Sequence, residues 1–193
     1  MLSILLKLIS LYVIFFCYND FIRRSTYDKK LQNYLLVLIF SFGLLVLATI
    51  FLDVFKTSNG DAVLTGVIAT FGGTPYQASG FFDHTIQFSL LNLFAFGLPA
   101  LIGLVAVIAV INDKKTSMKK LLFGVLLTFA FVISTVLIFQ IPSNTTHITT
   151  ILGAEISGNF ESLNLAIGGI LAYVFSIIGA VLSLVYSVLQ FEK

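Results

Sequence analysis

Four apolar segments, each long enough to cross a lipid bilayer, constrain this chain more than any other feature. They cover residues 34–55, 86–111, 121–141 and 163–189. A helix of about 20 apolar residues spans the hydrocarbon core of a membrane. Only 10% of the 193 residues are charged and 58% are hydrophobic, more apolar surface than one soluble core of this size can bury. We therefore predict an all-α polytopic membrane protein with a four-helix transmembrane core and lipid as its first partner.

The first 20 residues form a further apolar helix that is short for a span. Ser3, Lys7 and Ser10 recur at helical spacing on one face. Such a stripe fits a helix lying in the membrane interface, and it equally fits a span whose lysine reaches the interface. Both placements of residues 1–20 stay open. Cys17 is the single cysteine, so no internal disulfide forms.

Loops rich in Lys and Arg alternate along the chain with loops that contain almost none. Lys and Arg gather before residue 34 and again between residues 111 and 121, whereas loops 56–85 and 142–162 hold only Lys56. Basic loops remain on the cytoplasmic side. We therefore predict a multi-pass protein of the plasma membrane, with the C-terminus inside and loops 56–85 and 142–162 outside.

The polar residues suggest an internal repeat at an offset of 85 residues. Asp28-Lys29-Lys30 then falls on Asp113-Lys114-Lys115, and Ser58-Asn59 on Ser143-Asn144. With a deletion, Leu91-Asn92-Leu93 meets Leu163-Asn164-Leu165. After the N-terminal helix 1–20, this divides the chain into hairpin units 21–111 and 112–193, which would be parallel two-helix repeats.

Each unit carries a short apolar run in its outer loop, at residues 61–73 and 148–158. A dozen apolar residues are too few to span a bilayer, and broken half-helices flanking a cavity are one interpretation. The other is a pair of outer strands, because Thr, Val and Ile favour strands, with residues 61–71 paired to 147–156. In either case we expect the two runs to lie near each other on the outer side.

Acidic residues and histidines also collect in the outer loops. Asp83 and His84, beside Glu155 or His147, are candidates for an ion or proton site, and an acidic mouth would concentrate cations. Glu155 stands inside an apolar run, where a carboxylate needs a partner. No metal-ligand spacing is present, so we predict neither a metal nor a cofactor.

Polar and small residues mark the helices themselves. Asn92 and Asn164 match in the repeat, and each is a candidate for an interhelical hydrogen bond or a substrate contact. The last helix carries small residues every three or four positions, which favours close helix packing. These residues are Gly168, Ala172, Ser176, Gly179, Ser183 and Ser187.

The sequence contains none of the common catalytic motifs. It lacks Gly-x-Ser-x-Gly, a phosphate-binding loop and His-Glu-x-x-His. We therefore predict a non-catalytic subunit or accessory protein of a membrane assembly, which binds further copies or other membrane subunits and no nucleic acid. The alternative is a small oligomeric transporter or channel with an outward acidic cavity. An intramembrane enzyme would have only Asp83, His84 and Glu155 for its chemistry.

Overall fold

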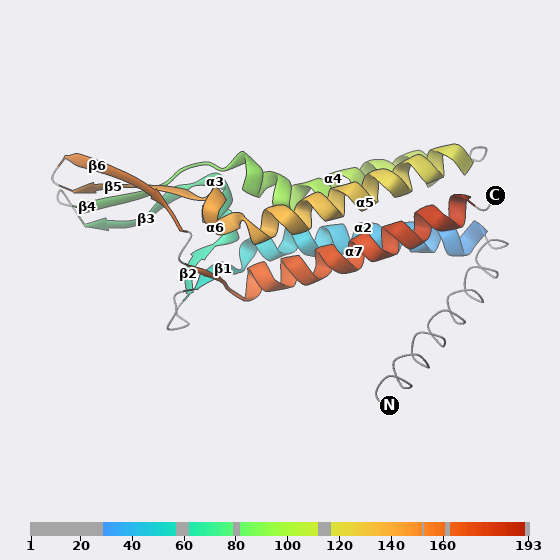
Figure 1. Ribbon diagram of the computed structural model, residues 1–193, viewed down its shortest axis with the longest axis horizontal. Coiled ribbons are helices and arrows are strands. Elements are labelled where there is room, and N and C mark those ends of the chain that lie inside the picture. The colour runs from blue at the N-terminus through green and yellow to red at the C-terminus, as the bar shows by residue number, and fades with distance from the viewer. Residues whose placement is uncertain are drawn as a thin grey trace, which may run out of the picture.

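The computed structural model describes residues 29–56, 62–78, 82–111, 117–151, 153–160 and 163–191, so the predicted helix over 1–20 lies outside the described residues. Four long helices form a bundle with a layer of strands at one end (Figure 1). The helices are α2 (Lys29–Ala48, continued by the 3-10 turn η1, Thr49–Phe51), α4 (Leu90–Ile111), α5 (Ser117–Phe139) and α7 (Ile167–Phe191). All four are long and apolar enough to cross a membrane.

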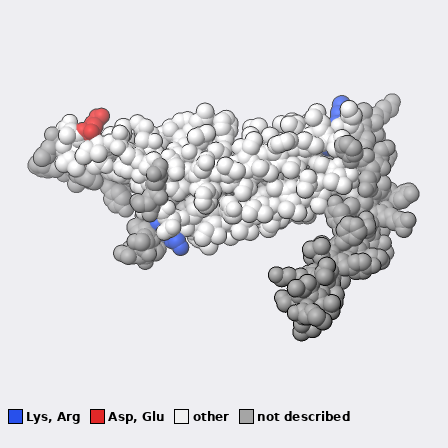
Figure 2. Space-filling model, in the orientation of Figure 1, with Lys and Arg blue, Asp and Glu red and all other residues white. Residues whose placement is uncertain are grey.

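Each helix packs against two others, in the circular order α2, α4, α5, α7. The outside of the bundle is apolar, with side chains such as Leu101 and Phe129 exposed over 65% and 62% of their surface. Figure 2 shows no charged side chain along the middle of this face of the bundle. These properties fit a multi-pass membrane protein, because lipid covers apolar surface without cost.

Small residues set the spacing of the helices. A Cβ added to Gly43 of α2 would lie 3.0 Å from the backbone of Pro99 and Ala100 in α4. A Cβ on Gly179 of α7 would overlap the ring of Phe131 in α5. The six small residues of α7 named above are all buried, and Gly179 therefore contacts a helix of its own chain.

The strands form two antiparallel sheets at the end of the bundle where α2 and α5 finish. The smaller sheet has the order β2-β1-β7, from β2 (Ala62–Thr65), β1 (Asp53–Lys56) and β7 (Asn164–Leu165). The larger sheet has the order β3-β4-β5-β6, from β3 (Gly73–Ala78), β4 (Phe82–Ile86), β5 (Thr146–Ile151) and β6 (Ala154–Asn159). Short helices α3 (Gly66–Phe71) and α6 (Ile141–Asn144) join the sheets to the bundle.

The prediction of an all-α fold is wrong for this end of the chain. The run 61–73 divides into β2, α3 and the start of β3, whereas 148–158 lies in β5 and β6. Thr65 caps α3 by accepting a hydrogen bond from Ile68 N. In the second run, β-branched residues dominate β5 and Gly153 takes φ 86° at the turn into β6, which favours a hairpin.

The predicted pairing of 61–71 with 147–156 is also wrong. Strand β2 pairs with β1, and β5 pairs with β4 and β6. The two runs that match at an offset of 85 residues thus adopt different secondary structures. The first helix also ends earlier than expected, because residues 53–55 of the predicted span 34–55 lie in β1.

Candidate functional site

The four-stranded sheet extends beyond the end of the bundle, and its strands run broadly along the bundle's long axis (Figure 1). Its register sorts the side chains onto two faces, because successive residues of a strand alternate. Asp83 pairs with Thr150, and Thr150 pairs with Glu155. These three residues therefore form one row across β4, β5 and β6, with both carboxylates exposed.

The two histidines lie on the opposite face of this sheet. The rings of His84 and His147 are 5.0 Å apart, and the ring of Phe160 lies 4.7 Å from that of His147. Phe160 also packs against Phe55 of β1, with ring centroids 5.5 Å apart. We call His84, His147, Phe160 and Phe55 the aromatic cluster; it joins the larger sheet to the smaller one.

Neighbouring residues set the environment of each histidine ring in this cluster. His84 Nδ1 lies 3.0 Å from Thr149 Oγ1. Burial, and secondarily the neighbouring His147, lower the pKa of His84 below its ordinary value of 6.5. Gly158 leaves room for the second ring, because a Cβ there would lie 3.0 Å from His147 Cε1. The neutral form of the His84 ring is therefore favoured where it packs against His147.

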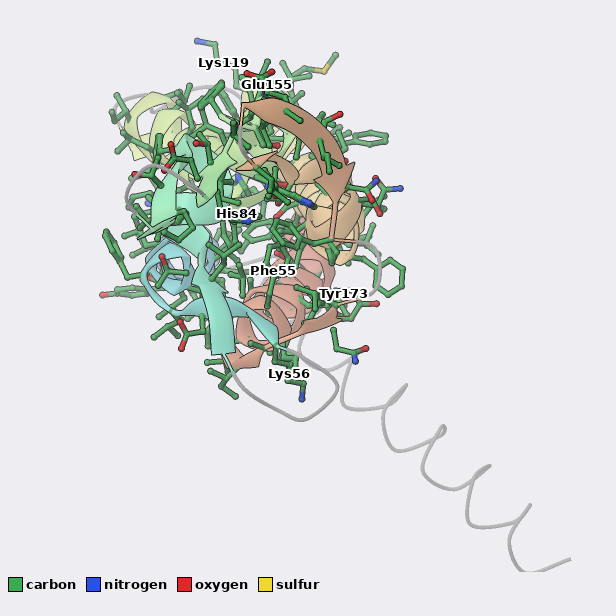
Figure 3. All side chains as sticks on the ribbon, turned by 90° about the vertical axis from the view of Figure 1, so that its left-hand side faces the viewer. Phe55, Lys56, His84, Lys119, Glu155 and Tyr173 are labelled. Carbon is green, nitrogen blue, oxygen red and sulfur yellow. The ribbon has the colours of Figure 1, made fainter. Side chains whose placement is uncertain are left out.

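Of the residues proposed to share an ion or proton site, His84 lies beside His147, whereas Asp83 and Glu155 lie on the other face of the sheet. Figure 3 shows Glu155 at the rim of the sheet end, with His84 and Phe55 nearer its centre. Asp83 lies on the same face as Glu155 and on the opposite face from His84. Within the described ranges, no three His, Cys, Asp or Glu residues gather as metal ligands do.

Asn92 is the polar centre of the junction between bundle and strands. Its Nδ2 donates to Ala69 O and to Thr145 Oγ1, both at 2.8 Å. Thr145 Oγ1 in turn donates to Ile141 O at 2.8 Å. The side chain is fully buried, so Asn92 ties α4 to both outer loops at once.

Asn164 has a different environment despite its matching place in the repeat. It lies in β7, opposite Lys56 of β1, and is exposed. Asn92, Asn164 and Glu155 therefore do not meet at one position. Sequence reasoning missed Thr145, whose position just after Asn144 carried no signal of a contact with a residue 53 positions away.

The edge strand β6 of the larger sheet is largely exposed. Five of its six residues are exposed, among them Ile156 at 59%. Its register with β5 is continuous from Ile151↔Ala154 to Thr146↔Asn159. In the described part of the chain, no strand pairs with the outer side of β6. The sequence signal for this strand was the Leu-Gly turn after a β-branched run.

No protein-family model, no curated protein and no solved structure matches this chain.

Proposed function

We propose that this chain is a non-catalytic accessory subunit of the plasma membrane, which spans the bilayer with four helices and binds a partner protein through its four-stranded sheet. The observation that carries the proposal is the sheet itself. It extends past the bundle (Figure 1), and its outermost strand offers exposed apolar and acidic side chains. A strand exposed in this way is a ready template for pairing.

The distribution of charge supports an orientation with the sheet outside. Lys119 lies in the first turn of α5, and the opposite end of α5 leads through α6 into β5. Asp83 and Glu155 are both in the larger sheet. Basic residues favour the cytoplasmic side, so the sheet would face outward and meet partners there.

The interior of the bundle supports an accessory role better than transport. Its centre is filled by large apolar side chains, including Phe96, Phe131 and Leu127. The hydroxyls at this depth bond within the protein: Ser134 Oγ donates to Ala95 O and lies 3.1 Å from Ser176 Oγ. A transport site would need polar groups converging near the midplane, and Asn92, Asn164 and Glu155 lie apart.

Native mass spectrometry of the tagged full chain, extracted in native lipid particles, tests this function. We expect a different protein at a fixed stoichiometry. Ile156→Asp on β6 should lower the recovery of this partner protein at least tenfold, because the new carboxylate would lose its hydration in an apolar contact. Asn164→Asp, which adds the same charge at an exposed position of the smaller sheet, should leave recovery unchanged. A pure homo-oligomer that conducts ions in liposomes would contradict the proposal.

A further inference from the structure

The two edges of the larger sheet differ in their ability to accept another strand. Strand β3, at one edge, contains Pro75 and has a register irregularity between Gly73 and Tyr76. Proline has no N–H to donate, and bulges turn an edge away from a neighbour, so both features are known protections of sheet edges. Strand β6, at the other edge, contains no proline and no lysine and pairs with β5 without interruption.

The hairpin fixes which backbone groups of β6 are available. Ile151 pairs with Ala154 across a turn of two residues, and the pair that flanks such a turn exchanges hydrogen bonds. Because bonded and non-bonded pairs alternate, the N–H and C=O groups of Ala154, Ile156 and Gly158 point toward β5. Those of Glu155 and Ser157 point to the opposite edge, where no strand of the described residues pairs with β6.

Side chains next to this edge define the chemistry of a matching strand. Glu155 is exposed on β6, and Asp83 lies in the same row on β4. A strand added to β6 would place a residue directly opposite Glu155, where an opposite charge stabilises the pair and a like charge does not. On the other face, Ile156 would meet an apolar residue one position along. The edge therefore fits a segment in which Lys or Arg adjoins an apolar residue.

A second copy of this chain in the same membrane does not fit the edge. Closed dimers are twofold symmetric, and antiparallel pairing of two β6 strands needs a twofold axis across the strand. Strand β6 runs broadly along the long axis of the bundle (Figure 1). A twofold axis perpendicular to β6 would therefore place the second bundle on the opposite side of the paired strands, outside the bilayer that holds the first bundle. A segment of a different protein carries no such restriction.

We infer that the partner binds by adding an extended segment as a fifth strand to the free edge of β6, with a Lys or Arg side chain opposite Glu155. This inference rests on the proposed function, because it names how and with what chemistry that partner is held. Main-chain bonds from Glu155 and Ser157 supply the affinity, as in other cases of strand addition. The carboxylate of Glu155 selects the basic segment.

Ser157→Pro tests the edge directly. It removes an N–H that points outward while keeping the bonds between β5 and β6, and the matched control Ser157→Ala keeps that N–H. We expect Ser157→Pro to lower the amount of partner recovered per folded protomer at least tenfold. The proline removes one main-chain hydrogen bond to the added strand and blocks the close approach of that strand. Ser157→Ala should retain the partner. Hydrogen exchange of β4 and β5 should be the same in both variants, which shows that the sheet is intact.

A second variant keeps the test decisive if proline disturbs the hairpin. Glu155→Lys should lower recovery at least tenfold, and a photo-crosslinker at position 159 should label a partner peptide that contains Lys or Arg. Wild-type-like recovery with Ser157→Pro and Glu155→Lys would overturn this inference and leave the proposed function standing. A wild-type chain that recovers no other protein would overturn the proposed function, and this inference with it. Crosslinks from position 159 to the chain itself would overturn the assignment to a different protein.

Discussion

Asn92 Nδ2 and Thr145 Oγ1 lie 2.8 Å apart, and this bond joins the first turns of α4 to the segment between α6 and β5. The same amide nitrogen donates to Ala69 O at the end of α3. One side chain thus holds both outer loops on the bundle. Inside an apolar environment, a carbonyl left without its donor loses much of the energy of the bond.

The first prediction concerns this contact. Asn92→Ala should lower the free energy of unfolding by about 1–3 kcal/mol, because it leaves the buried Ala69 carbonyl without the amide donor. Thermal unfolding of the detergent-solubilised chain measures the change. The control is Asn164→Ala, since Asn164 is exposed and should change stability by no more than about 0.5 kcal/mol. Equal effects of the two substitutions would mean that the bonds to Ala69 and Thr145 contribute nothing measurable.

The second prediction concerns the packing of α7 on α5. Gly179→Ala should destabilise the bundle by about 1–3 kcal/mol, because the new methyl group would overlap the ring of Phe131. The control, Gly97→Ala in α4, adds a methyl group with nothing within 4 Å. There the better helix propensity of alanine should leave stability unchanged or raise it by up to about 1 kcal/mol. Unfolding in a titration of denaturing detergent compares the stability of the two variants. Unchanged stability in Gly179→Ala would show that α5 and α7 move apart to admit the methyl group without cost.

The third prediction concerns the two serines in the middle of the bundle. Ser134 Oγ donates to Ala95 O, which leaves Ser176 to donate to Ser134. Such bonds in membrane proteins contribute about 0.6 kcal/mol on average. A double-mutant cycle with Ser134→Ala and Ser176→Ala should therefore give a coupling energy of about that size. A coupling of zero would place the two hydroxyls in separate interactions.

The four long helices of this fold could be predicted from the sequence, whereas for the outer runs it left helix and strand open and gave the wrong strand pairing. Apolar length alone identified α2, α4, α5 and α7, because a bilayer demands about 20 apolar residues whatever their order. The short runs 61–73 and 148–158 are under no comparable length requirement. Thr65 to Phe71 and Thr146 to Ile156 are similar in composition, yet a threonine cap and close packing of Gly66 on Ile50 make α3, while pairing with β4 makes β5.

The candidate site shows the same limit at the level of single residues. Asp83 and His84 are adjacent in sequence and were expected to act together, but a strand places neighbours on opposite faces. His84 lies beside His147, 63 positions away and one of the two partners proposed for it. That contact depends on the register between β4 and β5, which long-range pairing fixes and local sequence does not.

The last prediction concerns the pH dependence of the aromatic cluster. Burial and then His147 lower the pKa of His84 from 6.5, so in the folded chain this ring takes up a proton only at a lower pH than in the unfolded chain. The contribution of His84 to the free energy of unfolding is therefore fully present above about pH 6.5. It decreases as the pH falls below that value, because the unfolded state then binds more protons than the folded state. Asp83 and Glu155 lie on the other face of the sheet.

Thermal midpoints of the full chain between pH 8 and pH 5 measure this dependence. His84→Gln should flatten the curve, because it removes the titrating ring. His147→Gln should reduce the slope without abolishing it, since it removes the second-ranked cause of the shift and leaves burial in place. The protection of the β4 and β5 amides, relative to their intrinsic exchange rates at the same pH, should decrease at pH 5 in the unmodified chain and be retained in His84→Gln. A midpoint in the unmodified chain that rises on acidification would reverse the sign and exclude His84 as the responsible group.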